Sequence, residues 1–180
     1  MQLLSTTVEH SPVIRSDTAV IVASGLLGTL GMTTIMYLAP LVGTRQVDAP
    51  LWIARIFVTT PTSAIGLGLS LHLVVGFAYA WLFARHIEPR LTEHPLRNGL
   101  VFGGAIWAFA QAIAVPATGS VAAAVGTMSL PAPGVLSVRL GVDGALVSLL
   151  AHLVYGSIVG SVYGCLARGL CVGRTCQRSR

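Results

Sequence analysis

Four long apolar segments alternate with shorter polar ones along the chain. They run over about residues 19–42, 63–84, 99–118 and 142–166, each roughly 20 residues or longer. A helix of that length crosses a hydrocarbon core of about 30 Å at 1.5 Å per residue. In lipid only helices and closed barrels satisfy every backbone polar group, and these segments show no strand-like alternation. The pattern therefore predicts an all-α, polytopic membrane protein of one domain with four transmembrane helices.

The connections between these helices differ in character. Residues 44–60 contain Trp52 and Arg55, residue types that favour the headgroup level, so we expect this stretch to lie in the membrane interface. Residues 85–98 form the most polar connection, and residues 119–138 are small and proline-containing. A short polar N-terminus and a basic C-terminal tail complete the chain. Three connections between four helices leave both chain ends on the same side of the membrane.

The second and fourth helices each carry a histidine followed by small residues at steps of four. The first ridge is His72, Gly76, Ala80 and Ala84, and the second ridge is His152, Gly156, Gly160 and Gly164. Residues four apart share one helix face, and small residues let membrane helices approach closely. We therefore expect the second and fourth helices to pack ridge on ridge, with the two histidines converging.

The two halves of the chain also resemble each other. The segment that begins at Leu26 aligns without a gap with the segment that begins at Phe102, matching Gly28 with Gly104. The pattern His-Leu-Val-x-Gly occurs in both the second and the fourth helices. Because two helices return the chain to its starting side, the similarity predicts two tandem helical hairpins. They would form a parallel internal repeat with its axis along the membrane normal.

Composition and charge agree with a membrane protein. Hydrophobic residues make up 54% of the chain and charged residues 9%, whereas charged residues are about a quarter of a soluble protein. The net charge of +5 comes from eleven arginines and no lysine. They sit singly at segment ends and in the tail, as topology signals do, so no nucleic-acid partner is expected.

The arginines also predict an orientation. Three of them, Arg45, Arg55 and Arg139, lie on the side opposite both chain ends, and the other eight lie on the same side as the ends. The positive-inside rule then places the N- and C-termini in the cytoplasm of a multi-pass protein of the cell (inner) membrane.

The polar candidates for function within the apolar segments are His72, His152 and Gln111. An ionisable residue in a membrane helix is a functional-site hypothesis by default. Two facing imidazoles can ligate haem b, and the small residues beside them would leave room for the macrocycle. Alternatively, each histidine makes a structural hydrogen bond across a helix interface. A third possibility is a proton or solute pathway, which requires an oligomer because one four-helix chain makes a poor pore.

No enzyme is expected from this sequence. No serine or cysteine shares a plausible site with a histidine and a carboxylate, and the glycines have helical spacing rather than that of a nucleotide-binding loop. Cys165, Cys171 and Cys176 match neither a zinc site nor a redox CxxC pair. We predict no catalytic residue, no metal site and, unless haem b is bound, no cofactor.

The segment GLLGTLGMTTIMYLAP of the first helix, together with AHLVYGSIVGSVYG near the end, resembles a family of small bacterial four-helix integral membrane proteins of unknown function. The resemblance covers nearly the whole chain and implies a fold and a membrane location, without site residues. The leading expectation is a non-enzymatic subunit or packing partner in a membrane assembly, surrounded by lipid and associated with itself or a larger complex. The alternatives are a b-type haem electron carrier that uses His72 and His152, and an oligomeric transporter or channel.

Overall fold

The computed structural model of the protein describes residues 17–91, 94–125 and 134–167. Within these residues the chain is all-helical. Four helical stretches are long and apolar enough to cross a membrane: Thr18–Val42, Pro61–Arg90, Pro95–Ala124 and Gly141–Leu166. These findings confirm the all-α class and the four apolar helices, and they indicate a membrane protein.

The first half of the chain contains two of these stretches and a short helix between them. Its elements are α1 (Asp17–Leu38), the 3-10 turn η1 (Ala39–Val42), α2 (Ala49–Ala54), α3 (Pro61–Leu82), the π-helical segment η2 (Phe83–Ile87) and η3 (Glu88–Arg90). Pro40 lies in η1, and Gly43 closes that turn with a left-handed φ of 86°. Helix α2 begins where the Asp48 carboxylate accepts a hydrogen bond from the Leu51 amide, an N-cap.

The second half repeats the order of long helix, connection and long helix. Its elements are α4 (Pro95–Phe109), the π-helical segment η4 (Ala110–Ala114), α5 (Val115–Val125), the 3-10 segment η5 (Val135–Leu140) and α6 (Gly141–Ala167). The third apolar helix therefore continues to Val125 and does not end near residue 118. Pro116 has no amide hydrogen to donate to the preceding turn, which is the π-helical segment η4. The local π geometry compensates for the missing hydrogen bond, so the helix continues through the proline.

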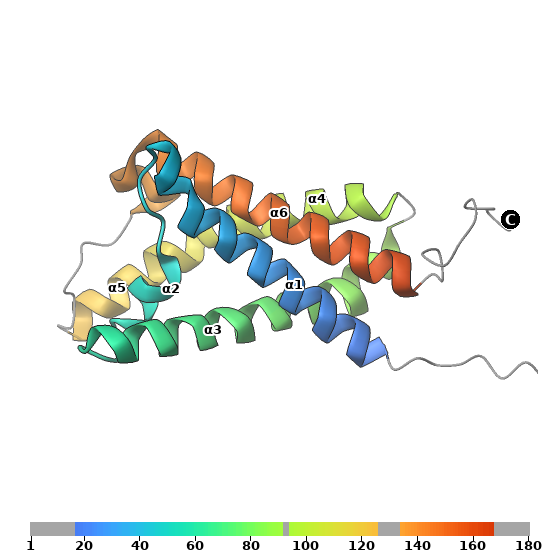
Figure 1. The fold of residues 1–180 in the computed structure, drawn as a ribbon, viewed down its shortest axis with the longest axis horizontal. Coiled ribbons are helices and arrows are strands. Elements are labelled where there is room, and N and C mark those ends of the chain that lie inside the picture. The colour runs from blue at the N-terminus through green and yellow to red at the C-terminus, as the bar shows by residue number, and fades with distance from the viewer. Residues whose placement is uncertain (1–16, 92–93, 126–133, 168–180) are drawn as a thin grey trace, which may run out of the picture.

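The four long helices do not contact one another equally. Helix α6 packs along both α1 and α4, and α3 packs along α1 (Figure 1). The start of α1, η3, the start of α4 and the end of α6 lie at one end of the bundle (Figure 1). Aromatic rings close the bundle near that end, with the ring centre of Phe83 5.1 Å from that of Phe102 and 6.4 Å from that of Tyr163.

Helix α2 folds back on α3 at the opposite end. A Cβ at Gly68 would lie 2.5 Å from the Pro50 carbonyl oxygen, so glycine is required for this approach. Trp52 of α2 is 8% exposed, and its ring faces the inside of the bundle. The first connection is therefore a packed cap on this end of the molecule.

The outer surface of the bundle is apolar. Large apolar side chains are exposed on every long helix, among them Leu30 on α1, Val74 on α3, Val101 on α4 and Leu150 on α6. A soluble protein rarely exposes contiguous apolar surface of this extent. The distribution fits helices that contact lipid or further membrane helices.

Candidate functional site

The second ridge packs against α4. A Cβ at Gly160 would lie 2.5 Å from the Pro95 carbonyl oxygen and 2.6 Å from the Gly99 Cα. A Cβ at Gly156 would lie 2.7 Å from the Cα of Gly103, and one at Gly164 would lie 2.5 Å from the Pro95 ring. Backbone therefore meets backbone along this interface, and glycine is needed on both helices.

The first ridge packs against α1. Gly76 lies against the Thr29 side chain, and a Cβ at Gly25 would lie 3.0 Å from the Cβ of Ala80. Ala84, the last member of this ridge, is buried in η2.

The two ridges thus do not pack on each other, and the predicted ridge-on-ridge packing of the second and fourth apolar helices is wrong. The periodicity of small residues shows which face of a helix is smooth but not which neighbour meets it. Smooth faces on α1, at Gly25, and on α4, at Gly99 and Gly103, take that place. Helix α6 also reaches α3, where the Tyr155 hydroxyl donates a hydrogen bond to the Gly76 carbonyl.

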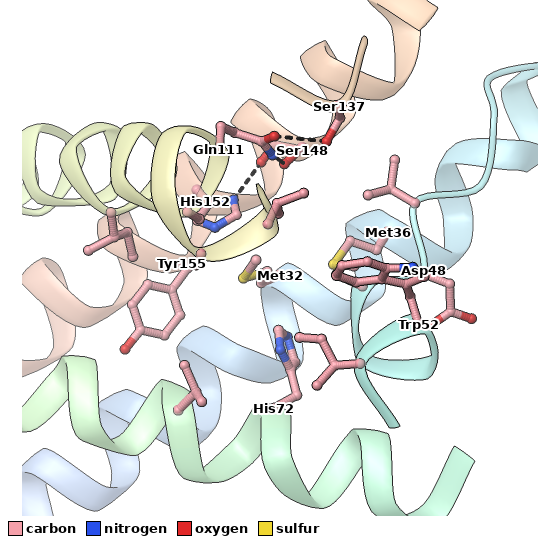
Figure 2. Close-up of a pocket in the computed structure, with 18 of the residues that line it drawn as sticks. Met32, Met36, Asp48, Trp52, His72, Gln111, Ser137, Ser148, His152 and Tyr155 are labelled. Atoms are coloured by element: carbon pink, nitrogen blue, oxygen red, sulfur yellow. Dashed lines mark hydrogen bonds between the residues drawn. The ribbon is translucent and has the colours of Figure 1, made fainter. Parts of the chain in front are cut away.

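A cavity of about 410 Å³ lies between the helices (Figure 2). Residues of α1, α2, α3, the α4–α5 stretch, η5 and α6 line it. Much of its wall is apolar and includes Met32, Met36 and Trp52. A mostly apolar cavity into which a few polar groups converge is the usual form of a small-ligand site.

A polar network forms one wall of this cavity. Gln111, 3% exposed, donates from its amide nitrogen to the Ser148 hydroxyl at 2.8 Å and accepts from the Ser137 hydroxyl at 2.8 Å. Three elements, η4, α6 and η5, are joined in this way. Ser137 has a φ of 55°, a left-handed conformation that costs on the order of 1–3 kcal/mol outside glycine. The hydrogen bond to Gln111 helps to hold it there.

Both histidines line this cavity. The ring of His152 lies 2.7 Å from the Ser148 carbonyl oxygen through Nδ1. Because a carbonyl oxygen can only accept, Nδ1 carries the hydrogen, and the neutral ring presents the lone pair of Nε2. The Nε2 atom of His72 is buried and has no hydrogen-bond partner among the described residues.

The structure thus brings His72, His152 and Gln111, all named from the sequence, to one cavity. The small residues beside the histidines were expected to leave space for a haem macrocycle. That space is filled, because Thr29 packs on Gly76 and α4 packs on Gly156. Space next to the imidazoles comes from the cavity itself.

Sequence reasoning missed several lining residues. Met32 and Met36 are spaced four apart on α1, a signal that was available but reads equally well as packing. Ser137 and Ser148 carried no signal, since single serines near membrane helices are common. Asp48, the one carboxylate among the lining residues, accepts from the Tyr37 hydroxyl at 3.3 Å and from the Gln46 amide at 3.3 Å.

Among the described residues, no group of three or more His, Cys, Asp or Glu side chains is placed to hold a metal ion. No family model, no curated protein and no solved structure matches the chain. The resemblance to small bacterial four-helix membrane proteins therefore stays a prediction.

Proposed function

We propose that this chain is a non-enzymatic integral membrane protein that holds a small ligand in the cavity between its helices, as a binding subunit of a membrane assembly. The observation that carries this proposal is the convergence of His72, His152 and Gln111 on one cavity. Its volume of about 410 Å³ falls within the range of roughly 300–1,000 Å³ found for small-molecule sites.

The Nε2 of His72, which has no hydrogen-bond partner within the described ranges, supports the proposal of a bound ligand. A buried polar atom without a hydrogen bond costs about 1–3 kcal/mol, so native structures rarely leave one unpaired without a reason. A ligand group at this position would remove that cost. The exposed apolar faces of the helices supply surface for lipid and for partner subunits.

Filling the cavity tests the proposal. Ala114 lines the cavity, whereas Ala112, in the same π-helical segment, is exposed. We expect A114L to lose a ligand that copurifies with the wild-type protein, because the added side chain takes up cavity space. A112L should retain it. Native mass spectrometry in detergent measures both, and equal retention by the two variants would contradict the proposal.

We also propose two tandem helical hairpins, in the inner membrane of a bacterial cell, with both termini in the cytoplasm. Within each hairpin the ridge of the second helix packs on the first helix, α3 on α1 and α6 on α4, which supports the repeat. The arginine asymmetry of eight against three supports the orientation. A reporter enzyme fused after Arg180 that is active only in the periplasm would contradict this orientation if it showed activity.

A second candidate ligand is haem b, held between His72 and His152. The specific observation in its favour is that both imidazoles line one cavity and that His152 donates its other ring N–H to a carbonyl, as ligating histidines do. A reduced-minus-oxidised spectrum of protein from haem-replete cells should then show a Soret band that H72A and H152A each abolish or shift. A flat spectrum, recorded at a protein concentration at which about one haem per chain would be visible, would rule out this candidate.

A further inference from the structure

Three soft or borderline ligand groups line the cavity from three different helices. The thioether of Met32 comes from α1, the imidazole of His72 from α3 and the imidazole of His152 from α6. Figure 2 shows the Met32 side chain between the two imidazole rings, which point into the cavity from opposite walls. We infer that this part of the cavity is a binding site for a soft monovalent metal ion, Cu(I). The inference rests on the proposed function of the cavity as a ligand site.

The donor set selects this class of metal. Thioether sulfur and imidazole nitrogen bind Cu(I), whereas Mg²⁺, Ca²⁺ and Mn²⁺ require carboxylate, carbonyl or water oxygen. None of the three side chains is anionic, which fits an ion of single charge in an apolar surrounding better than a divalent one. Asp48, at the Trp52 end of the cavity, supplies one negative charge among the lining residues.

The two imidazoles are prepared for this role in different ways. The Ser148 carbonyl holds the hydrogen on Nδ1 of His152, which leaves Nε2 as the donor atom. A hydrogen bond from the second ring nitrogen to a backbone carbonyl is the usual support of a ligating histidine. The Nε2 of His72 is buried and has no hydrogen-bond partner in the part of the chain that the structure describes, so a bound ion would give it one.

Met32 and Met36 provide a matched pair for the test. Both line the cavity from α1, and both are buried, at 8% and 2% exposure. Met36 lies toward Trp52 and away from His152 in Figure 2. An ion bound between the two imidazoles would therefore contact Met32 and would not contact Met36. Replacing either methionine with leucine keeps the apolar volume and removes the sulfur.

The experiment is a competition for Cu(I) between the full-length protein in detergent and the chelator bicinchoninate, under anaerobic conditions. We expect the wild-type protein to take up one equivalent. M32L and H72L should each weaken binding about tenfold or more, which corresponds to roughly 1.4 kcal/mol per factor of ten, and M36L should stay close to wild type. X-ray absorption of the copper-loaded protein should show one sulfur and two nitrogen neighbours, and M32L should lose the sulfur. Unchanged melting temperatures of the copper-free variants show that folding is intact.

Two results would overturn the inference. One is no uptake by the wild-type protein in the presence of the competitor, and the other is equal weakening by M32L and M36L. If the protein takes up no Cu(I) but A114L still loses a copurified ligand that A112L retains, the metal inference fails and the proposed function stands. A bis-imidazole haem would leave the spectrum of M32L unchanged, so the same variant separates copper from haem.

Discussion

The α4–α6 pair and the α1–α3 pair use the same stripe of small residues to build two different interfaces. In α4–α6, the glycines of both helices bring backbone against backbone, as at Gly160 and Gly99. In α1–α3, a side chain enters the contact, because Thr29 packs on Gly76 and Ala80 packs on Gly25. The α4–α6 contact is therefore rigid, because it is made by backbone atoms. The α1–α3 contact includes side chains, which can shift when a neighbouring residue changes.

Helices of both pairs line the cavity. Helix α6 packs along both α1 and α4, whereas α3 packs along α1 and α2 and accepts a hydrogen bond from the Tyr155 hydroxyl of α6. Residues of α1, α3, the α4–α5 stretch and α6 form the cavity wall, so helices of both interfaces contribute to it.

Breaking the α4–α6 interface should have the largest effect. In G160L the side chain would run into the Pro95 carbonyl oxygen and the Gly99 Cα, which are backbone atoms that cannot rotate away. We expect a loss of about 3 kcal/mol or more, or roughly 6–12 °C in melting temperature for a chain of this length. Thermal unfolding in detergent measures this loss. G66L is the control, because nothing lies within 4 Å of a Cβ at Gly66, and a G160L variant that melts like wild type would contradict the backbone contact.

Disturbing the α1–α3 interface should cost less and should be reversible. G76A pushes against the Thr29 side chain, so we expect a loss of about 1–3 kcal/mol. Adding T29A removes the obstructing hydroxyl and methyl group and should recover much of that loss in a double-mutant cycle. No side-chain substitution on α4 should rescue G160L in the same way. Additive effects of G76A and T29A would show that the two residues do not meet.

The smallest effect on stability is expected at the histidine of the first ridge. H72L removes a buried Nε2 that has no hydrogen-bond partner among the described residues. The free energy of unfolding of the ligand-free variant should therefore lie within about 1 kcal/mol of the wild-type value or slightly above it. H152L should cost more, because it leaves the Ser148 carbonyl without its imidazole partner. Paired melting curves of the two variants check the order, and a larger loss for H72L would contradict it.

Much of the architecture was predictable from local pattern. The apolar segments predicted all four long helices, since length and hydropathy are properties of consecutive residues. Their outer limits were less predictable, as the helix that continues through Pro116 to Val125 shows. The spacing of His72 and His152 within similar stripes also predicted that the two residues belong to one site.

The composition of that site was less accessible. Met32 lies in a different helix from either histidine, and no spacing in the chain relates a thioether on α1 to imidazoles on α3 and α6. Gln111 was recognised because a buried amide in an apolar helix is rare. Its partners were not, because Ser137 reaches it only through a left-handed turn in η5.

The sequence by itself determined which segments are helical, which faces are smooth and which polar side chains lie inside the apolar segments. Tertiary structure alone decided that the second ridge meets α4 and the first meets α1, and that the histidines face a cavity instead of each other's ridge. The physical reason is that a smooth face packs on any complementary smooth face. Four such faces on α1, α3, α4 and α6 allow several pairings, and the pairing formed depends on the fit of Thr29, Gly99 and Gly103 in three dimensions.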